Sequence, residues 1–279
     1  MPAPGAHRRR RPAMSAGILG GGTRIVARRD RRAYGMGLGV ILLDDVYPGF
    51  PGDVRNASSW PYPLQYDVAE GVDIFRLVDP DHPDRDSCFE AILASARRLE
   101  RLGCRAIAAE CGFFCYFQRR IADALSVPVF MSSLLQVPWA RQTLGQARSV
   151  AVLTGFPQSL TPRHLDAVGI VADERTKLFS TYELCGSDAP EFKKLWSTRG
   201  LRTDPPSADF DLAREQIVRA ARAIVAGNPD VGALVLECTG YPPFAAAIQA
   251  AIDLPVFSWG TLLDYAYSIA VHRAYRGHV

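Results

Sequence analysis

The sequence predicts an α/β fold made of two pseudo-symmetric parallel-sheet α/β domains, and three observations support this prediction. Apolar runs of strand length recur along the chain, helical stretches alternate with them, and one segment repeats another without a gap. Strands that alternate with helices are typical of parallel sheets covered by helices.

The expected strands are continuous apolar runs rather than alternating ones. Continuous runs are typical of strands that are buried on both faces of a sheet. They lie at 38–43, 105–109, 127–131, 150–153, 178–182, 233–236 and 254–257.

Helical stretches lie between these runs. In the first of them, Ile92, Ala96 and Leu99 fall on one stripe, which predicts an amphipathic helix. The expected helices span 87–102, 118–125, 161–168, 209–226, 244–252 and 261–275.

The repeat appears when the sequence is shifted by about 127 positions, so that residues 103–135 align with residues 230–262. Ten of the 33 aligned positions are identical, and they include the pairs Glu110/Glu237 and Cys111/Cys238. The repeat predicts that the two halves share one architecture.

The domain organisation follows from the repeat and from the charge distribution. Residues 1–36 hold nine arginines and one acid, a charge of +8, so the remaining chain carries −5 against the total of +3. We expect residues 1–36 to be a disordered basic leader. The first α/β domain is expected to span 37–140 and 262–279, and the second 141–261.

Several classes of function are excluded by composition. No apolar run reaches the roughly 18 residues of a membrane-spanning helix, and no secretory signal is apparent. The body of the chain is acidic, so no nucleic-acid partner is expected. The six cysteines contain no C-x-x-C pair, which disfavours both a disulfide scaffold and a metal site. A cytoplasmic protein is therefore predicted.

The repeated Glu-Cys pair is the strongest indication of chemistry. Each cysteine follows a buried strand and precedes a turn and a helix, the place where open α/β sheets bind ligands. Helix N-termini favour anions there, and the same field is expected to lower the pKa of a thiol. Facing halves would hold two thiols on opposite sides of one cleft.

Such a pair can move a proton from one face of a carbon to the other without a cofactor. One thiolate removes the proton next to a carboxylate or carbonyl, the second thiol delivers a proton to the opposite face, and amides at the turns stabilise the developing charge. The sequence thus predicts a racemase or epimerase of a small acid, amino acid or hydantoin-like substrate, with Cys111 and Cys238 as catalytic residues.

At these residues the sequence resembles the aspartate/glutamate racemase superfamily, which includes hydantoin racemases, maleate isomerases and arylmalonate decarboxylases. The resemblance covers about residues 35–276 and is most specific at two motifs. These are Glu110-Cys111-Gly112-Phe113-Phe114, and Leu236-Glu237-Cys238-Thr239 with the later Pro255-Val256-Phe257.

The resemblance implies a cleft active site between the domains, no cofactor and a homodimer. Cys111 and Cys238 match the acid/base pair of the superfamily. The other positions that match substrate-binding residues are Asp44 after the first strand, the turn residues Gly112, Phe113, Thr239 and Gly240, and Ser133 and Thr154 at two further strand ends. Val46 and Gly49 stand where relatives carry basic residues, which argues against aspartate and glutamate as substrates.

Two other functions remain open. A single thiol would suffice for a cis-trans isomerase or a decarboxylase, and a non-catalytic protein that binds small acids could use the same two-lobed body.

Three segments next to the motifs carry further expectations. Glu110 and Glu237 precede the thiols, so they should point to the other side of their strands and shape the turns, or else relay protons. The stretch 47–66 is either a lid over the cleft or packing on the sheet edge, and 186–210 is expected to be a surface connection.

Overall fold

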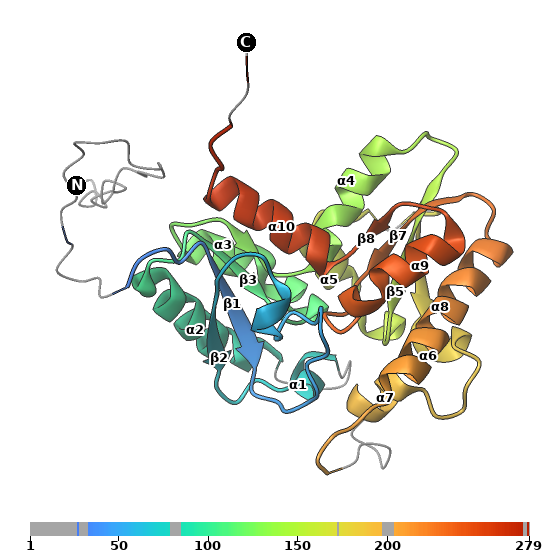
Figure 1. Ribbon diagram of the computed structural model, residues 1–279, viewed down its shortest axis with the longest axis horizontal. Helices are drawn as coiled ribbons and strands as arrows, with labels where there is room; N and C mark the ends of the chain where they lie inside the picture. Colours follow the sequence, from blue (N-terminus) through green and yellow to red (C-terminus); the bar gives the residue numbers. More distant parts are fainter. Residues whose placement is uncertain are drawn as a thin grey trace, which may run out of the picture.

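The strands of the protein form two four-stranded sheets, and every strand pair in them is parallel. The computed structural model describes residues 27, 33–78, 85–171, 173–196, 204–275 and 278, so the expected leader lies almost wholly outside the described residues. Figure 1 shows the two sheets as separate groups of strands with helices around them. The predicted α/β fold with two parallel sheets is confirmed.

The first sheet has the strand order β2-β1-β3-β4. Helix α2 packs on this sheet with Ile92, Ala96 and Leu99 buried, the stripe that the sequence predicts. It ends where Gly103 adopts a left-handed φ of 103°, which glycine accommodates without strain. The elements are β1 (Leu38–Leu43), β2 (Leu64–Ala69), α1 (Ile74–Val78), α2 (Cys88–Leu102), β3 (Ala106–Ala109), α3 (Gln118–Ala124) and β4 (Val129–Phe130).

The second sheet repeats this topology with the order β6-β5-β7-β8. Strands β5, β6, β7 and β8 take the places of β1, β2, β3 and β4, as the internal repeat predicts. The elements are β5 (Ser149–Thr154), α5 (Pro162–Ala167), β6 (Thr176–Ser180), α6 (Thr181–Leu184), α7 (Glu191–Trp196), α8 (Phe210–Gly227), β7 (Val231–Leu236), α9 (Ala245–Ile252) and β8 (Val256–Phe257).

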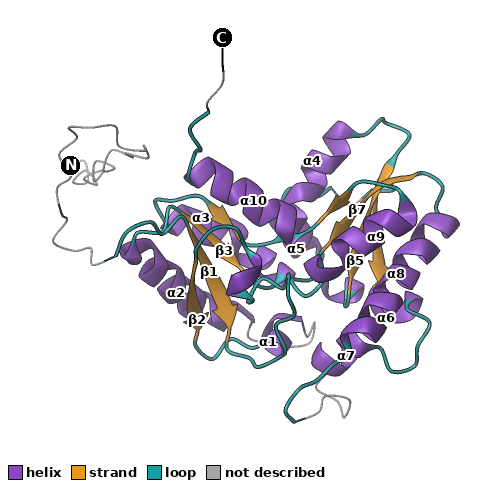
Figure 2. Cartoon of the chain, in the orientation of Figure 1, coloured by secondary structure: helices purple, strands orange, loops and turns teal. Residues whose placement is uncertain are grey.

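Two helices tie the sheets together by crossing over. Helix α4 (Gln136–Thr143) follows β4 of the first sheet but packs on β5 and β7 of the second, whereas α10 (Trp259–Ala270) follows β8 and packs on β1 and β3. Both helices begin beside the junction, where Gln136 Nε2 donates to the carbonyl of Ser258 at 2.9 Å. Figure 2 shows α10 lying across the first sheet. This exchange holds the carboxyl ends of β1 and β3, the central strands of the first sheet, against the carboxyl ends of β5 and β7, the central strands of the second.

The structure corrects three expectations about individual elements. Strand β2 falls partly within the stretch 47–66 and was not predicted, because Gln65 and Asp67 interrupt its apolar pattern. The strand expected at 178–182 ends at Ser180, whose side chain accepts from the amide of Glu183 and starts α6. The stretch 186–210 contains helix α7, which buries Trp196.

Short 3-10 helices join many of the longer elements. One of them directly follows Glu110-Cys111, and another begins four residues after Cys238. They span Ala57–Ser59, Arg85–Ser87, Gly112–Phe117, Ser133–Leu135, Pro157–Ser159 and Pro242–Phe244. Among the described residues, no helix has both the length and the apolar character needed to cross a membrane.

Candidate active site

Both cysteines of the repeated motif line one narrow cavity between the two sheets. Strand β3 ends at Ala109 and β7 ends at Leu236, so each Glu-Cys pair follows directly after a central strand. The cavity is narrow, with a volume of about 30 Å³.

The cavity draws residues from both halves of the chain. The side of the first sheet is mainly apolar around its cysteine, whereas the side of the second sheet carries hydroxyl and indole groups. The lining residues are Leu43, Tyr47, Ile74, Val78, Glu110, Cys111, Gly112 and Phe113 from the first half, and Gly155, Phe156, Tyr182, Trp196, Glu237, Cys238, Thr239 and Tyr241 from the second.

The two thiols are held in their protonated form by their surroundings. Burial raises the pKa of Cys111 and of Cys238 well above the ordinary value, and the negative charge of Glu237 raises both further. Amides of Phe113 and Gly240 bond to the respective sulfurs and oppose the rise. The expectation that helix ends lower the thiol pKa is therefore wrong, because desolvation outweighs the amide contribution.

Glu110 is held by a buried ion pair. Arg55 donates from Nε to Glu110 Oε2 at 3.0 Å and from NH2 to Oε1 at 2.5 Å, and its guanidinium lies 3.6 Å from the centre of the Tyr47 ring. The Tyr47 hydroxyl and the amide of Leu43 also donate to this carboxylate, at 3.1 and 2.6 Å. Every lone-pair direction of Glu110 is thus used, and the pair fixes the loop after β1 over the cavity.

Glu237 occupies the equivalent position but has no such partner. The Thr154 hydroxyl donates to its Oε2 at 2.8 Å, and no ion pair involves this carboxyl among the described residues. Burial raises the pKa of Glu237 to about 7. Its Oε1 lies against Gly112 of the opposite half, where a Cβ would come within 1.8 Å of it.

Both glutamates line the cavity together with the cysteines, contrary to expectation. The prediction assumed that side chains alternate between the two faces of a strand, so that each glutamate would point to the face opposite its cysteine. Strands β3 and β7 end one residue before their glutamates, so the alternation of side chains along a strand does not extend to Glu110 and Glu237.

Two polar groups at the cavity have no hydrogen-bond partner among the residues that the structure describes. The Tyr182 hydroxyl and the indole Nε1 of Trp196 are buried and unpaired. Buried donors without partners are unusual in folded proteins and destabilise them by about 1–3 kcal/mol each. Their position in the lining suits an anionic ligand, to which both groups can donate.

The structure brings together some of the predicted site residues and not others. Cys111, Cys238, Gly112, Phe113 and Thr239 line the cavity. The positions outside the lining are Asp44, Ser133, Thr154 and Gly240.

Each of these four residues has a different role in the structure. Asp44 is exposed, and its carboxylate accepts from the amide of Gly71 at 2.8 Å. The Ser133 hydroxyl donates to the carbonyls of Leu236 and Glu237, at 2.9 and 3.1 Å, and so braces the second Glu-Cys turn. Thr154 holds Glu237, and Gly240 supplies an amide to Cys238, as described above. The substrate-binding role expected of Asp44 is therefore not supported.

The sequence did not indicate Tyr182, Trp196 and Tyr241 as lining residues, nor Arg55, which lies outside the lining and pairs with Glu110. Tyr182 lies at the end of an apolar run that predicted a strand, and Trp196 lies in a stretch that looked like a surface connection. The aromatic residues Tyr47 and Trp196 pack edge to face at 4.3 Å between ring centres. In the stretch 47–66, Tyr47 lines the cavity, whereas Tyr62 stacks on Trp60 and on Tyr267 of α10. Whether this stretch acts as a lid stays a prediction.

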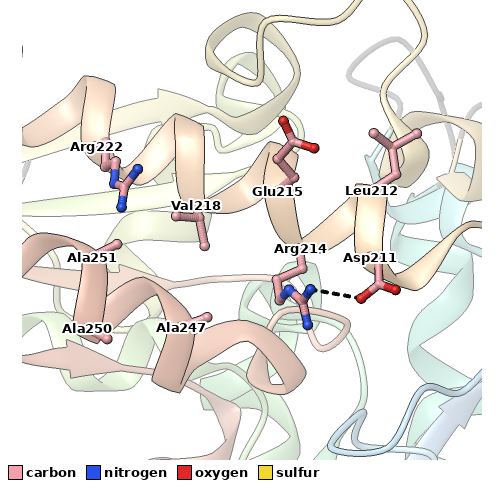
Figure 3. Close-up of a pocket in the computed structure, with 9 residues that line it drawn as sticks. All are labelled: Asp211, Leu212, Arg214, Glu215, Val218, Arg222, Ala247, Ala250 and Ala251. Atoms are coloured by element: carbon pink, nitrogen blue, oxygen red, sulfur yellow. Dashed lines mark ion pairs between the residues drawn. The ribbon is translucent and has the colours of Figure 1, made fainter.

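A second depression of about 650 Å³ lies between α8 and α9 (Figure 3). Its polar side chains belong to helix α8, and Arg214 pairs with Asp211 at 2.9 Å. It contains no thiol and no buried ionisable group, so the cavity with the two cysteines is the candidate active site. The described residues contain no group of three or more His, Cys, Asp or Glu side chains that could hold a metal ion.

The fold is that of the aspartate/glutamate racemase superfamily. A mutant of arylmalonate decarboxylase in a sulfate-associated form matches with a TM-score of 0.54 at 16% identity, covering 85% of this chain and 94% of that one. Allantoin racemase from Pseudomonas fluorescens matches with a TM-score of 0.52 at 13% identity, covering 87% and 99%. The resemblance found in the sequence is confirmed at the level of the fold.

Sequence comparison places the chain more narrowly. A dimethylsulfoniopropionate lyase from Durusdinium sp. clade D is 33% identical over 227 residues, covering 79% of this chain and 70% of the relative. Dimethylsulfoniopropionate lyase 6 of Emiliania huxleyi (strain CCMP1516) is 32% identical over 223 residues, covering 79% and 56%. The chain belongs to this family of lyases, which are enzymes.

Relatives in this family are often longer than the present chain. The chain spans between 45% and 63% of the length of four relatives from Emiliania huxleyi (strain CCMP1516). No protein-family model matches the chain.

Proposed function

We propose that the protein is a lyase that cleaves dimethylsulfoniopropionate, or a close sulfonium acid, by elimination. The relatives named above carry this activity in their names. The observation that carries the proposal for this chain is the pair of thiols in one cavity whose unpaired donors suit a carboxylate.

The substrate has a carboxylate at one end and a dimethylsulfonium cation at the other. A thiolate, of Cys111 or Cys238, takes a proton from the carbon next to the carboxylate and becomes a thiol. The electron pair of that C–H bond forms the new double bond. The C–S bond breaks, and its electron pair leaves with neutral dimethyl sulfide. Acrylate remains, and the thiol returns its proton to water before the next turnover.

The residues of the cavity support each part of this step. Tyr182 and Trp196 can donate to the carboxylate, which stabilises the negative charge that develops as the proton leaves. The positive sulfonium, held in a dry cavity, lowers the pKa of the nearby thiols and so promotes thiolate formation when substrate is bound. The reaction moves one proton and transfers no electrons to a carrier, so the proposal includes no cofactor.

A two-thiol racemase is the second candidate, and the same observation favours it. Cys111 and Cys238 come from equivalent turns and line one cavity, and the ionisation of Cys238 raises the pKa of Cys111. Such an enzyme would exchange the proton next to a carboxylate with solvent and release no fragment.

The two functions are separated by one experiment in deuterium oxide. The purified protein is incubated with dimethylsulfoniopropionate, and separately with small chiral acids, amino acids and hydantoins. The lyase releases dimethyl sulfide and acrylate in equal amounts. A racemase instead incorporates deuterium at the stereocentre of an intact substrate, and that result without sulfide release would overturn the lyase proposal.

We also propose the homodimer expected from the sequence. Two exposed aromatic residues, Trp139 on α4 and Tyr265 on α10, lie together with 5.8 Å between ring centres. Exposed aromatic pairs of this kind favour protein–protein contact. Light scattering of the purified protein would give twice the mass of the chain, and the mass of a single chain would refute the dimer.

A further inference from the structure

The two glutamates of the internal repeat have unequal surroundings. Glu110 is neutralised by Arg55 and accepts four hydrogen bonds. Glu237, at the equivalent position, accepts one bond from Thr154 and has no cation beside it among the described residues. Packing alone does not explain why one copy of the repeat carries a counter-ion and the other does not.

An unpaired carboxylate in a buried site is unfavourable unless a ligand compensates it. Glu237 is 3% exposed and lines the cavity. Its Oε1 lies next to Gly112, which adjoins Cys111, while its own neighbour in the chain is Cys238. The carboxyl therefore lies close to both Glu-Cys turns, in the same lining as the two thiols.

Among the described residues, the lining of the cavity carries one negative charge that is not neutralised and no positive charge. Among its lining residues only the two glutamates ionise as acids near neutral pH, and the charge of Glu110 is cancelled by Arg55. The unpaired donors of Tyr182 and Trp196 provide a separate place for an anion. A zwitterionic ligand, with a carboxylate at one end and a cation at the other, complements both features.

We propose that Glu237 is the counter-ion for the positively charged end of the substrate and makes the site specific for onium acids, whether sulfonium or quaternary ammonium. The inference rests on the proposed lyase function and deepens it. Aromatic side chains in the same cavity, Tyr47 and Trp196 among them, add favourable contacts with a methylated cation.

The test uses two ligands of equal shape that differ in charge. β-Alanine betaine carries a trimethylammonium group and has no sulfonium leaving group. In its neutral isostere, a tert-butyl group replaces the trimethylammonium group. Dissociation constants of both are measured by calorimetry at about pH 8.5, where Glu237 is ionised. The wild-type protein is expected to bind the betaine at least about ten-fold more tightly than the isostere.

The variant Glu237→Gln keeps the shape of the side chain and its bond with Thr154 but removes the charge. It is expected to lose the preference for the betaine while binding the neutral isostere as the wild type does. Thr154→Val is the control, because it removes that hydrogen bond and leaves the carboxyl group in place. Loss of the bond raises the pKa of Glu237, so this variant is measured at a higher pH, where it should keep the preference. Circular dichroism of each variant verifies that it is folded.

The outcomes separate this inference from the function on which it rests. If the wild type releases dimethyl sulfide but binds the two ligands equally, or if Glu237→Gln keeps the preference, the role of Glu237 is overturned and the lyase proposal stands. If the wild type neither binds the ligands nor releases dimethyl sulfide, both are overturned.

Discussion

The substitution Glu237→Gln should make the protein more stable above neutral pH and leave its stability unchanged in acid. Burial raises the pKa of Glu237 from 4.5 to about 7 in the folded protein. Between these values the folded state keeps a proton that the unfolded state has lost, so the free energy of unfolding decreases as the pH rises through this window. Above pH 7 the ionised carboxylate of Glu237 stays buried, which lowers the free energy of unfolding by about 3 kcal/mol relative to the protonated form.

Glutamine does not ionise, so the variant escapes this penalty. We expect equal stability at about pH 4.5 and a gain of up to about 3 kcal/mol at about pH 8.5, which for a chain of this size is about 5–10 °C in Tm. Urea unfolding at several pH values measures the difference. Glu183→Gln, at an exposed position, is the control and should show no pH-dependent gain. A variant as stable as the wild type, or less stable, across the whole range would refute the reasoning.

Three further substitutions test the other parts of the cavity. Arg55→Met leaves Glu110 buried without its partner and should lower the free energy of unfolding at neutral pH by about 3–5 kcal/mol, a loss that urea unfolding measures and that shrinks in acid as Glu110 is protonated. Tyr182→Phe removes an unpaired hydroxyl, so we expect stability to rise by about 1 kcal/mol while kcat/KM for sulfide release decreases about ten-fold. Lower stability with unchanged kcat/KM would contradict the binding role. Gly112→Ala brings a methyl group against Glu237 and should reduce both stability and the binding of β-alanine betaine, whereas tight binding by a stable variant would show that the two groups are not in contact.

Much of the fold can be predicted from patterns that are local in the sequence. Continuous apolar runs mark the central strands β1, β3, β5 and β7, because strands buried on both faces exclude polar residues. Strand β2 lies at a sheet edge and is only half-buried. It contains polar residues, so it does not form a continuous apolar run and could not be predicted from this pattern. The internal repeat predicts that the two sheets share one topology, since similar sequences favour similar structures.

The site could be predicted only where the repeat covers it. Cys111 and Cys238 were found because the same residue type recurs after the same strand in both halves. Arg55, Tyr182 and Trp196 lie outside the repeated segments, and nothing in their local sequence indicates that tertiary folding brings them to the cysteines. Electrostatics at the thiols could not be inferred either, since the balance between helix-end amides and burial depends on how closely the two halves pack.

Release of dimethyl sulfide by single cysteine variants tests the role of the two thiols most directly. Dimethyl sulfide in the headspace is measured after dimethylsulfoniopropionate is added to the wild type and to the variants Cys111→Ser and Cys238→Ser. We expect the wild type to release sulfide and acrylate together, and replacement of the cysteine that takes the proton to reduce the rate by about 10²–10⁴-fold. Wild-type rates in both variants would contradict proton abstraction by these thiols.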